Sequence, residues 1–147
     1  MFEVTRSHLG RCKISDGTLI TLRLAIGQIA EAPLPRGPTG LILGVGTSVS
    51  VGAESPKDLR EKVKDKPLGP ADGSHLNNNE IWKFVDFTEV DPAFEDATYA
   101  GSDGIKYLVS SEVEPTIISR TLAYHDEVGN PLYWLRWADK TSIRLAK

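Results

Sequence analysis

Apolar and polar residues alternate along the segment from Thr18 to Ile26. A period of two residues places every second side chain on the same side of an extended chain, so this segment predicts a half-buried β-strand. The buried side would carry Ile20, Leu22, Leu24 and Ile26. Asp16-Gly17, a dipeptide typical of tight turns, comes just before it. The turn predicts a hairpin with the preceding segment, Arg11–Ser15, and hence antiparallel β-structure.

Further short segments of this kind follow one another along the chain, separated by turns and loops rich in Gly and Pro. They are Phe2–Arg6, Leu41–Val51, Glu80–Val90, Ile105–Val113, Ile117–Tyr124, Leu132–Trp137 and Thr141–Leu145. Pro115 is expected to end the strand before it, and Asp91–Gly104 is expected to be irregular. An α/β fold would need a helix between successive strands, and that is not what the pattern predicts.

A single helix is predicted over residues 56–65. Ser55 is a favourable N-cap, Pro56 suits the first helical position, and Asp58 completes a capping signature with Ser55. The fold class expected is therefore mostly β, a small antiparallel barrel or sandwich of about seven to eight strands with one short surface helix over residues 56–65. With 147 residues, the chain is expected to form a single β-rich domain over residues 1–147.

Composition narrows the class of protein further. Apolar residues make up 40% of the chain and charged residues 25%, values that exclude a disordered tail and a polytopic membrane protein. The net charge is −3, and residues 80–114 carry nine acidic side chains against two basic ones. This balance disfavours nucleic acid as a partner. No segment predicts a signal peptide or a membrane span, so we expect a soluble, cytoplasmic protein that does not bind membranes.

Catalytic and metal-binding signatures are not found in the sequence. The Gly-rich segment 44–48 lacks the third small residue of a dinucleotide fingerprint, and the histidines lack the spacing of a helical zinc pair. Cys12 is the lone cysteine and is expected to be buried, although flanking Arg11 and Lys13 could instead lower its pKa. The acidic segment 86–103 contains no EF-hand pattern. The sequence therefore predicts no catalytic residue, no metal site and no cofactor.

A face of small residues is expected on the predicted strand Leu41–Val51. Its members are Gly44, Gly46, Ser48 and Ser50. Because such residues allow close approach, we expect the predicted helix or another segment of the chain to cover this face.

The carboxy-terminal third mixes aromatic residues with arginines, a composition found at interface centres. In the predicted hairpin, Tyr124 pairs with Tyr133, Leu122 with Leu135 and Arg120 with Trp137. This register leaves two side chains without an internal role. Trp134 and Arg136, together with Arg144, are therefore the candidate partner-binding residues, most simply in a homodimer.

The function expected is a small β-rich binding or assembly module without catalytic activity of its own, whose partner is another protein or a second copy. Two alternatives remain open from the sequence. One is a nucleic-acid-binding small β-barrel. The other is a small enzyme or metal-dependent hydrolase that uses the acidic segment 86–103.

Overall fold

The computed structural model describes residues 1–33, 40–69 and 81–146. They form nine strands in two antiparallel sheets and one short helix. The elements are β1 Phe2–His8, β2 Gly10–Ile14, β3 Leu19–Glu31, β4 Leu43–Glu54, α1 Lys57–Val63, β5 Lys83–Phe84, β6 Phe87–Asp91, β7 Ala93–Ala100, β8 Lys106–His125 and β9 Pro131–Leu145. The predicted mostly-β class is confirmed. Within the described residues the two sheets form a sandwich and do not close into a barrel.

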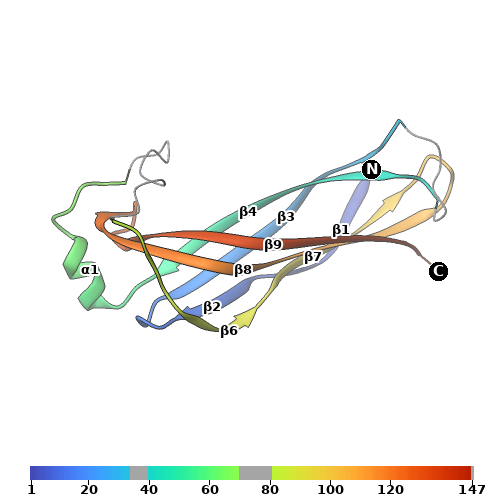
Figure 1. The fold of residues 1–147 in the computed structure, drawn as a ribbon. Coiled ribbons are helices and arrows are strands. Elements are labelled where there is room, and N and C mark those ends of the chain that lie inside the picture. The colour runs from blue at the N-terminus through green and yellow to red at the C-terminus, as the bar shows by residue number, and fades with distance from the viewer. Residues whose placement is uncertain (34–39, 70–80, 147) are drawn as a thin grey trace.

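The five-stranded sheet is built on the long strand β8. β9 pairs with one side of β8, while β7 and the two-residue strand β5 share the other side, and β1 pairs with β7. The four-stranded sheet has the order β4-β3-β2-β6. Figure 1 shows an elongated molecule with α1 at one end and both chain termini at the other.

The two sheets are joined along one side, where the chain passes directly from one sheet to the other. Only Leu9 separates β1 from β2, and only Pro92 separates β6 from β7. At this crossing Gly10 lies against Ala93, so close that a Cβ on Gly10 would come within 2.4 Å of the Ala93 amide nitrogen. β4 and β9 are the outer strands that take no part in the crossing.

The interior contains two successive apolar clusters along the length of the sandwich. The alternating residues of β3 supply both, and Ile20, Leu22, Leu24 and Ile26 are all buried as predicted. The first cluster consists of Cys12, Ile14, Ile20, Leu22, Leu24, Ala93, Val113, Ile118 and Leu135. The second consists of Ile26, Ile29, Leu43, Ala97, Tyr99, Tyr107 and Val109.

Three strand predictions are corrected. The expected irregular segment 91–104 contains β7, whose buried residues are Ala93, Ala97 and Tyr99. Two of these residues are small and the charged Glu95 lies on the same side, so the alternation in hydropathy is weak. Pro115 does not end its strand, because it lies at a β-bulge within β8, where a residue without an N–H is tolerated. The expected strand 80–90 is divided, since β5 pairs with β8 in one sheet and β6 pairs with β2 in the other. Residue 80 lies outside the described residues.

The expected start of the helix is also corrected. α1 has Pro56 as its N-cap and no side-chain capping bond. Ser55 is buried, and its hydroxyl lies 3.0 Å from the Thr18 hydroxyl instead of capping the helix. Leu59 and Val63 are the buried residues of α1.

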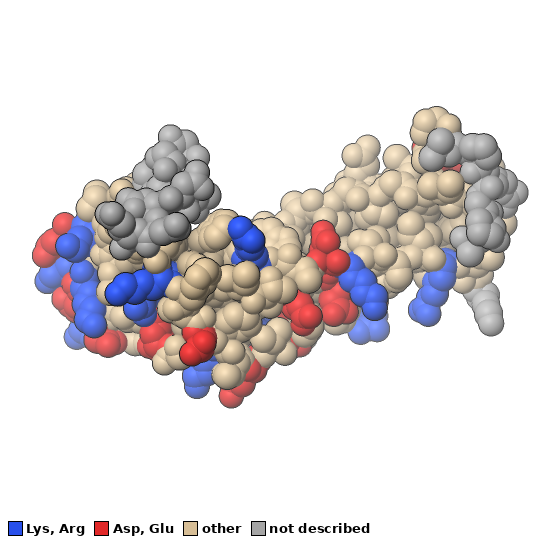
Figure 2. Space-filling view, in the orientation of Figure 1, with Lys and Arg blue, Asp and Glu red and all other residues tan. Residues whose placement is uncertain are grey.

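The small-residue face of β4 is exposed, which contradicts the expectation that another segment covers it. Gly44, Gly46, Ser48 and Ser50 all lie on the outer surface of the four-stranded sheet. The helix cannot reach this surface, because its buried side faces β8 and β9 at the end of the sandwich. Figure 2 shows few charged side chains on the upper right surface, along which β4 runs in Figure 1.

The predicted pairing of the last hairpin is wrong. Over residues 117–121, each residue of β8 pairs with a residue of β9 four positions away from the one predicted. Tyr133 pairs with Arg120 and Leu135 with Ile118. The turn contains Gly129, at φ +90, and Asn130, whose amide is held by Asp126. A displacement by an even number of residues changes the neighbours of a side chain but not the face on which it lies. Trp134 therefore keeps the face that the sequence predicts.

Candidate functional site

Two aromatic side chains lie in one row on the outer face of the five-stranded sheet. Phe84 pairs with Ser119 and Ser119 pairs with Trp134, so the three residues form one row across β5, β8 and β9. The next row holds Ile117 and Arg136. Directly paired residues of antiparallel strands lie on the same face. We refer to these five residues as the aromatic patch.

The patch leaves large apolar side chains in contact with solvent. Phe84 is 80% exposed and Ile117 is 37% exposed, while Trp134 is half-buried. The guanidinium carbon of Arg136 lies 5.3 Å from the Trp134 ring centroid, in a cation–π arrangement. An Arg side chain extended over a tryptophan is held in position before any partner arrives.

The structure brings two of the three candidate residues together. Trp134 and Arg136 are adjacent on the outer face, whereas Arg144 lies eight positions beyond Arg136 on β9, at a distance of roughly 27 Å along the strand. Arg144 is exposed and pairs with Leu108. It therefore does not belong to the aromatic patch.

Phe84 and Ile117 were missed by sequence reasoning. One continuous strand over residues 80–90 was expected, and that expectation did not single out Phe84 as a residue on the outer face. Its outward direction follows from the passage of the chain between sheets, since Val85 already packs against the core and Phe87 pairs in the other sheet. No local signal marks that passage.

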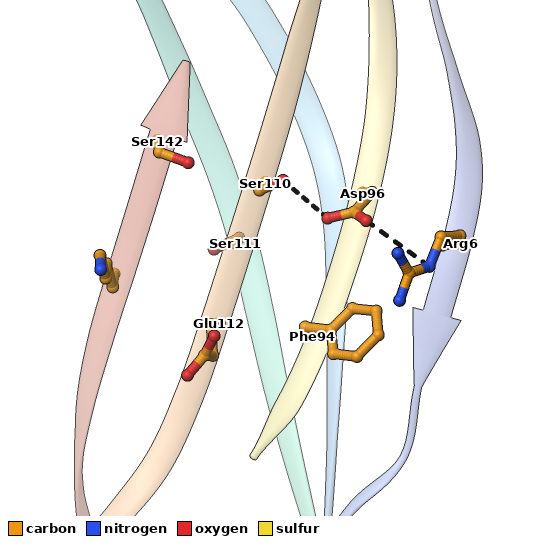
Figure 3. Close-up of a pocket in the computed structure, with 8 residues that line it drawn as sticks. Arg6, Phe94, Asp96, Ser110, Ser111, Glu112 and Ser142 are labelled. Carbon is orange, nitrogen blue, oxygen red and sulfur yellow. Dashed lines mark hydrogen bonds and ion pairs between the residues drawn. The ribbon is translucent and has the colours of Figure 1, made fainter. Parts of the chain in front are cut away.

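A shallow polar trough of about 290 Å³ occupies the other half of the same outer face. It is lined by Arg6, Phe94, Asp96, Ser110, Ser111, Glu112, Lys140 and Ser142. Figure 3 shows the Asp96 carboxylate between Ser110, which donates a 2.7 Å hydrogen bond, and the Arg6 guanidinium at 3.8 Å. The Arg6 guanidinium carbon lies 4.9 Å from the centroid of the Phe94 ring.

Acidic and basic side chains alternate across this trough. One row of paired residues contains Arg6 and Asp96, and the next contains Glu112 and Lys140. A nucleic-acid surface would instead present a stripe of basic residues. The trough supplies no such stripe.

Three carboxylates of the acidic segment 86–103 have separate partners. Asp91 lies 2.8 Å from His8, Glu95 accepts a 2.8 Å bond from the Ile26 amide, and Asp96 faces the trough. In the described part of the chain, no group of three or more His, Cys, Asp or Glu side chains is placed to hold a metal ion.

A polar network is buried between the sheets near α1. The Asp16 carboxylate accepts 2.8 Å hydrogen bonds from the Arg120 guanidinium, the Tyr133 hydroxyl and the Thr18 amide. Burial raises the pKa of Asp16, but these hydrogen bonds outweigh it and hold the pKa below its usual 3.8. Burial also raises the pKa of Tyr133. Asp16 lies between β2 and β3, whereas Arg120 and Tyr133 lie on β8 and β9, so this network joins the two sheets.

Asn130 extends this contact between the sheets to the edge of β4. Its side-chain NH₂ donates a 2.8 Å hydrogen bond to the Ala53 carbonyl, and its side-chain oxygen accepts a 3.1 Å bond from the Ser55 amide. The residue before β9 is thereby tied to the end of β4.

Cys12 is fully buried in the core, as predicted. Alternation along β2 turns Arg11 and Lys13 outward, so these cations do not activate the thiol. Burial raises the pKa of Cys12 to about 11. We expect a thiol reagent such as Ellman's reagent to leave the folded protein unlabelled at pH 8 and to label the protein in denaturant. Labelling of the folded protein at the rate of a free thiol would contradict this burial.

Comparisons of the chain with protein-family models, curated proteins and solved structures found no match. In the described residues, no helix has the length and apolar character needed to span a membrane.

Proposed function

We propose that this protein is a binding and assembly module without catalytic activity of its own. It associates with another protein molecule, most simply a second copy of itself, through the aromatic patch. The observation that carries the proposal is the exposure of Phe84, at 80%, in the same row as Trp134 and beside Arg136.

The chemistry of the patch suits a protein contact. Trp, Phe and Arg are enriched in protein interfaces, and Trp and Arg dominate the energetic centres of such contacts. The row of Phe84, Ser119 and Trp134 lies on a sheet, so the backbone that presents the rings is already ordered. Little conformational entropy is then lost on binding, which favours affinity. The central Ser119 is buried between its larger neighbours and adds no bulk to the surface.

Replacement of Trp134 by alanine is the direct test. We expect Trp134→Ala to weaken self-association by about 2 kcal/mol, roughly a 30-fold rise in the dissociation constant, because the anchor of the patch is removed. Sedimentation velocity over a concentration series measures the effect. Trp134 is outside both core clusters, so the variant should keep the circular dichroism spectrum of the folded protein.

Trp137→Ala is the matched control. Trp137 is the same residue type on the same strand and is 41% exposed, but it lies on the opposite face of β9 from the patch. We expect this variant to associate as the wild type does. Equal weakening by both substitutions, or no weakening by Trp134→Ala, would contradict a contact at the aromatic patch.

A further inference from the structure

β4 is an outer strand whose free edge is unpaired. It pairs with β3 from Leu43 to Glu54, and the described residues provide no other strand beside it. Among the described residues, Asn130 occupies the end of this edge, where it bonds to the Ala53 carbonyl. An unpaired edge presents a row of backbone donors and acceptors that can pair with another strand.

The other outer strands are protected against such pairing. β9 carries Asp139 opposite the buried Val113, so a charge points to the inner side of its edge. β1 has a bulge between Val4 and Arg6. β6 is short, and its Glu89 has a φ of +55°. Inward charges, bulges and short strands are devices that prevent edge-to-edge pairing.

β4 has none of these devices. It contains no charged residue from Leu43 to Ala53, no proline, and an unbroken backbone alternation, because the bulge in this pair lies on β3. The side chains of Thr47 and Val51 lie on the inner face of β4. Both are nevertheless exposed, Val51 to 42%. Both would be covered by a strand added at this edge.

The directions of the free backbone groups follow from the two ends of β4. The Ile42 carbonyl accepts a 2.8 Å bond from the Ala32 amide toward β3, whereas the Ala53 carbonyl faces Asn130. Since peptide groups alternate in direction along a strand, the odd-numbered residues between them present N–H and C=O to the free edge. These are Leu43, Val45, Thr47, Val49 and Val51.

We propose that β4 pairs antiparallel with β4 of a second copy of this chain, across a two-fold axis at Thr47. The free odd-numbered residues are symmetric about that position. Pairing there places Leu43 opposite Val51 and Val45 opposite Val49, with Thr47 opposite its own copy. The two-fold axis repeats the first two pairs, and each pair exchanges two backbone hydrogen bonds, so the contact has roughly ten in all.

A second copy fits this edge because a two-fold contact brings the same segment from both copies together, with the residue on the axis opposite its own equivalent. Any charged residue at the centre would then face a like charge, which is unfavourable. The uncharged centre of β4 avoids this repulsion. On the other face, Gly44 would lie opposite Ser50 and Gly46 opposite Ser48, so the exposed small residues permit two copies to approach without steric conflict.

This contact is separate from the aromatic patch, which lies on the outer face of the other sheet. A chain with two independent two-fold contacts links copies into a closed tetramer or an extended array. The edge is therefore tested in Trp134→Ala protein, in which the patch is weakened. We expect this protein to sediment as a dimer at high concentration.

Charge substitutions at Thr47 test the axis. Adding Thr47→Lys or Thr47→Glu to Trp134→Ala should each weaken the dimer by about tenfold or more, because like charges meet at the axis. Mixing the Lys and Glu proteins should restore a dimer through opposite charges, which also shows that both are folded. Gln28→Lys is the matched control, since Gln28 is exposed on the adjacent strand and not on the free edge.

Two results would overturn pairing at β4. One is a Trp134→Ala protein that remains monomeric at every accessible concentration, which would leave the edge to a strand of a different protein. The other is a dimer that Thr47→Lys leaves unchanged. Failure of the patch contact would give a different result. Trp134→Ala alone would then leave self-association as in the wild type, whereas Thr47→Lys would abolish it.

Discussion

Replacing Asp16 with alanine is expected to lower the free energy of unfolding by about 3 kcal/mol at neutral pH. Asp16 and Arg120 form an ion pair at 2.8 Å, with side chains only 11% and 20% exposed. Removal of one partner leaves the other as a largely buried charge without compensation, and the Tyr133 hydroxyl loses an acceptor. Urea denaturation followed by tryptophan fluorescence measures the loss.

The double variant Asp16→Ala/Arg120→Met is the control for this interpretation. Replacing both members of a buried pair removes the unpaired charge, so the double variant should be more stable than Asp16→Ala alone. Additive losses from the two substitutions would show that the residues act independently, contrary to the structure.

The effect of Asp16 should depend on pH in a defined direction. The pKa of Asp16 in the folded protein is held below 3.8, so its charge stabilises the fold above the pKa of the unfolded chain, about 4. This stabilisation is lost as the pH falls through the lower pKa of the folded state. The deficit of Asp16→Ala relative to the wild type should therefore shrink below about pH 4. A deficit that stays constant to pH 2 would show that it does not depend on the carboxylate charge.

Replacing Gly10 with alanine is also expected to cost about 3 kcal/mol, at the upper end of the range for overpacked sites. The added Cβ would lie 2.4 Å from the Ala93 amide nitrogen and 2.9 Å from its Cα. These are backbone atoms at the crossing of β1–β2 with β6–β7, and they cannot move without shifting the strands of both sheets. Thermal and urea denaturation would both report the loss.

Gly27→Ala is the matched control for Gly10. Gly27 also lies in a strand, but a Cβ there meets no atom within 4 Å. We expect this variant to be neutral or to gain up to about 1 kcal/mol, because alanine restricts the unfolded chain. Equal losses at both positions would show that the loss of glycine, and not the crossing, determines stability.

The assignment of residues to the two faces of β3 and β9 was determined by the sequence itself. Ile20 to Ile26 are buried at alternate positions because the period of a strand is two residues, and this does not depend on its neighbours. For the same reason Trp134 and Arg136 share the predicted outer face although the hairpin register differs by four residues. The single short helix after Ser55 and the burial of Cys12 also follow from local pattern.

The tertiary structure alone decided which strands are neighbours. Phe84 joins Trp134 only because β5 pairs with β8 while β6, after a break at residues 85–86, pairs with β2 in the other sheet. Ser55 turns to Thr18 and not to the helix because the sandwich places a buried hydroxyl beside it. In the described residues β4 is left with a free edge, because the crossings from β1 to β2 and from β6 to β7 lie on the other side of the sandwich. Strand order depends on contacts between residues far apart in the chain, and those contacts leave no periodic signal in the local sequence.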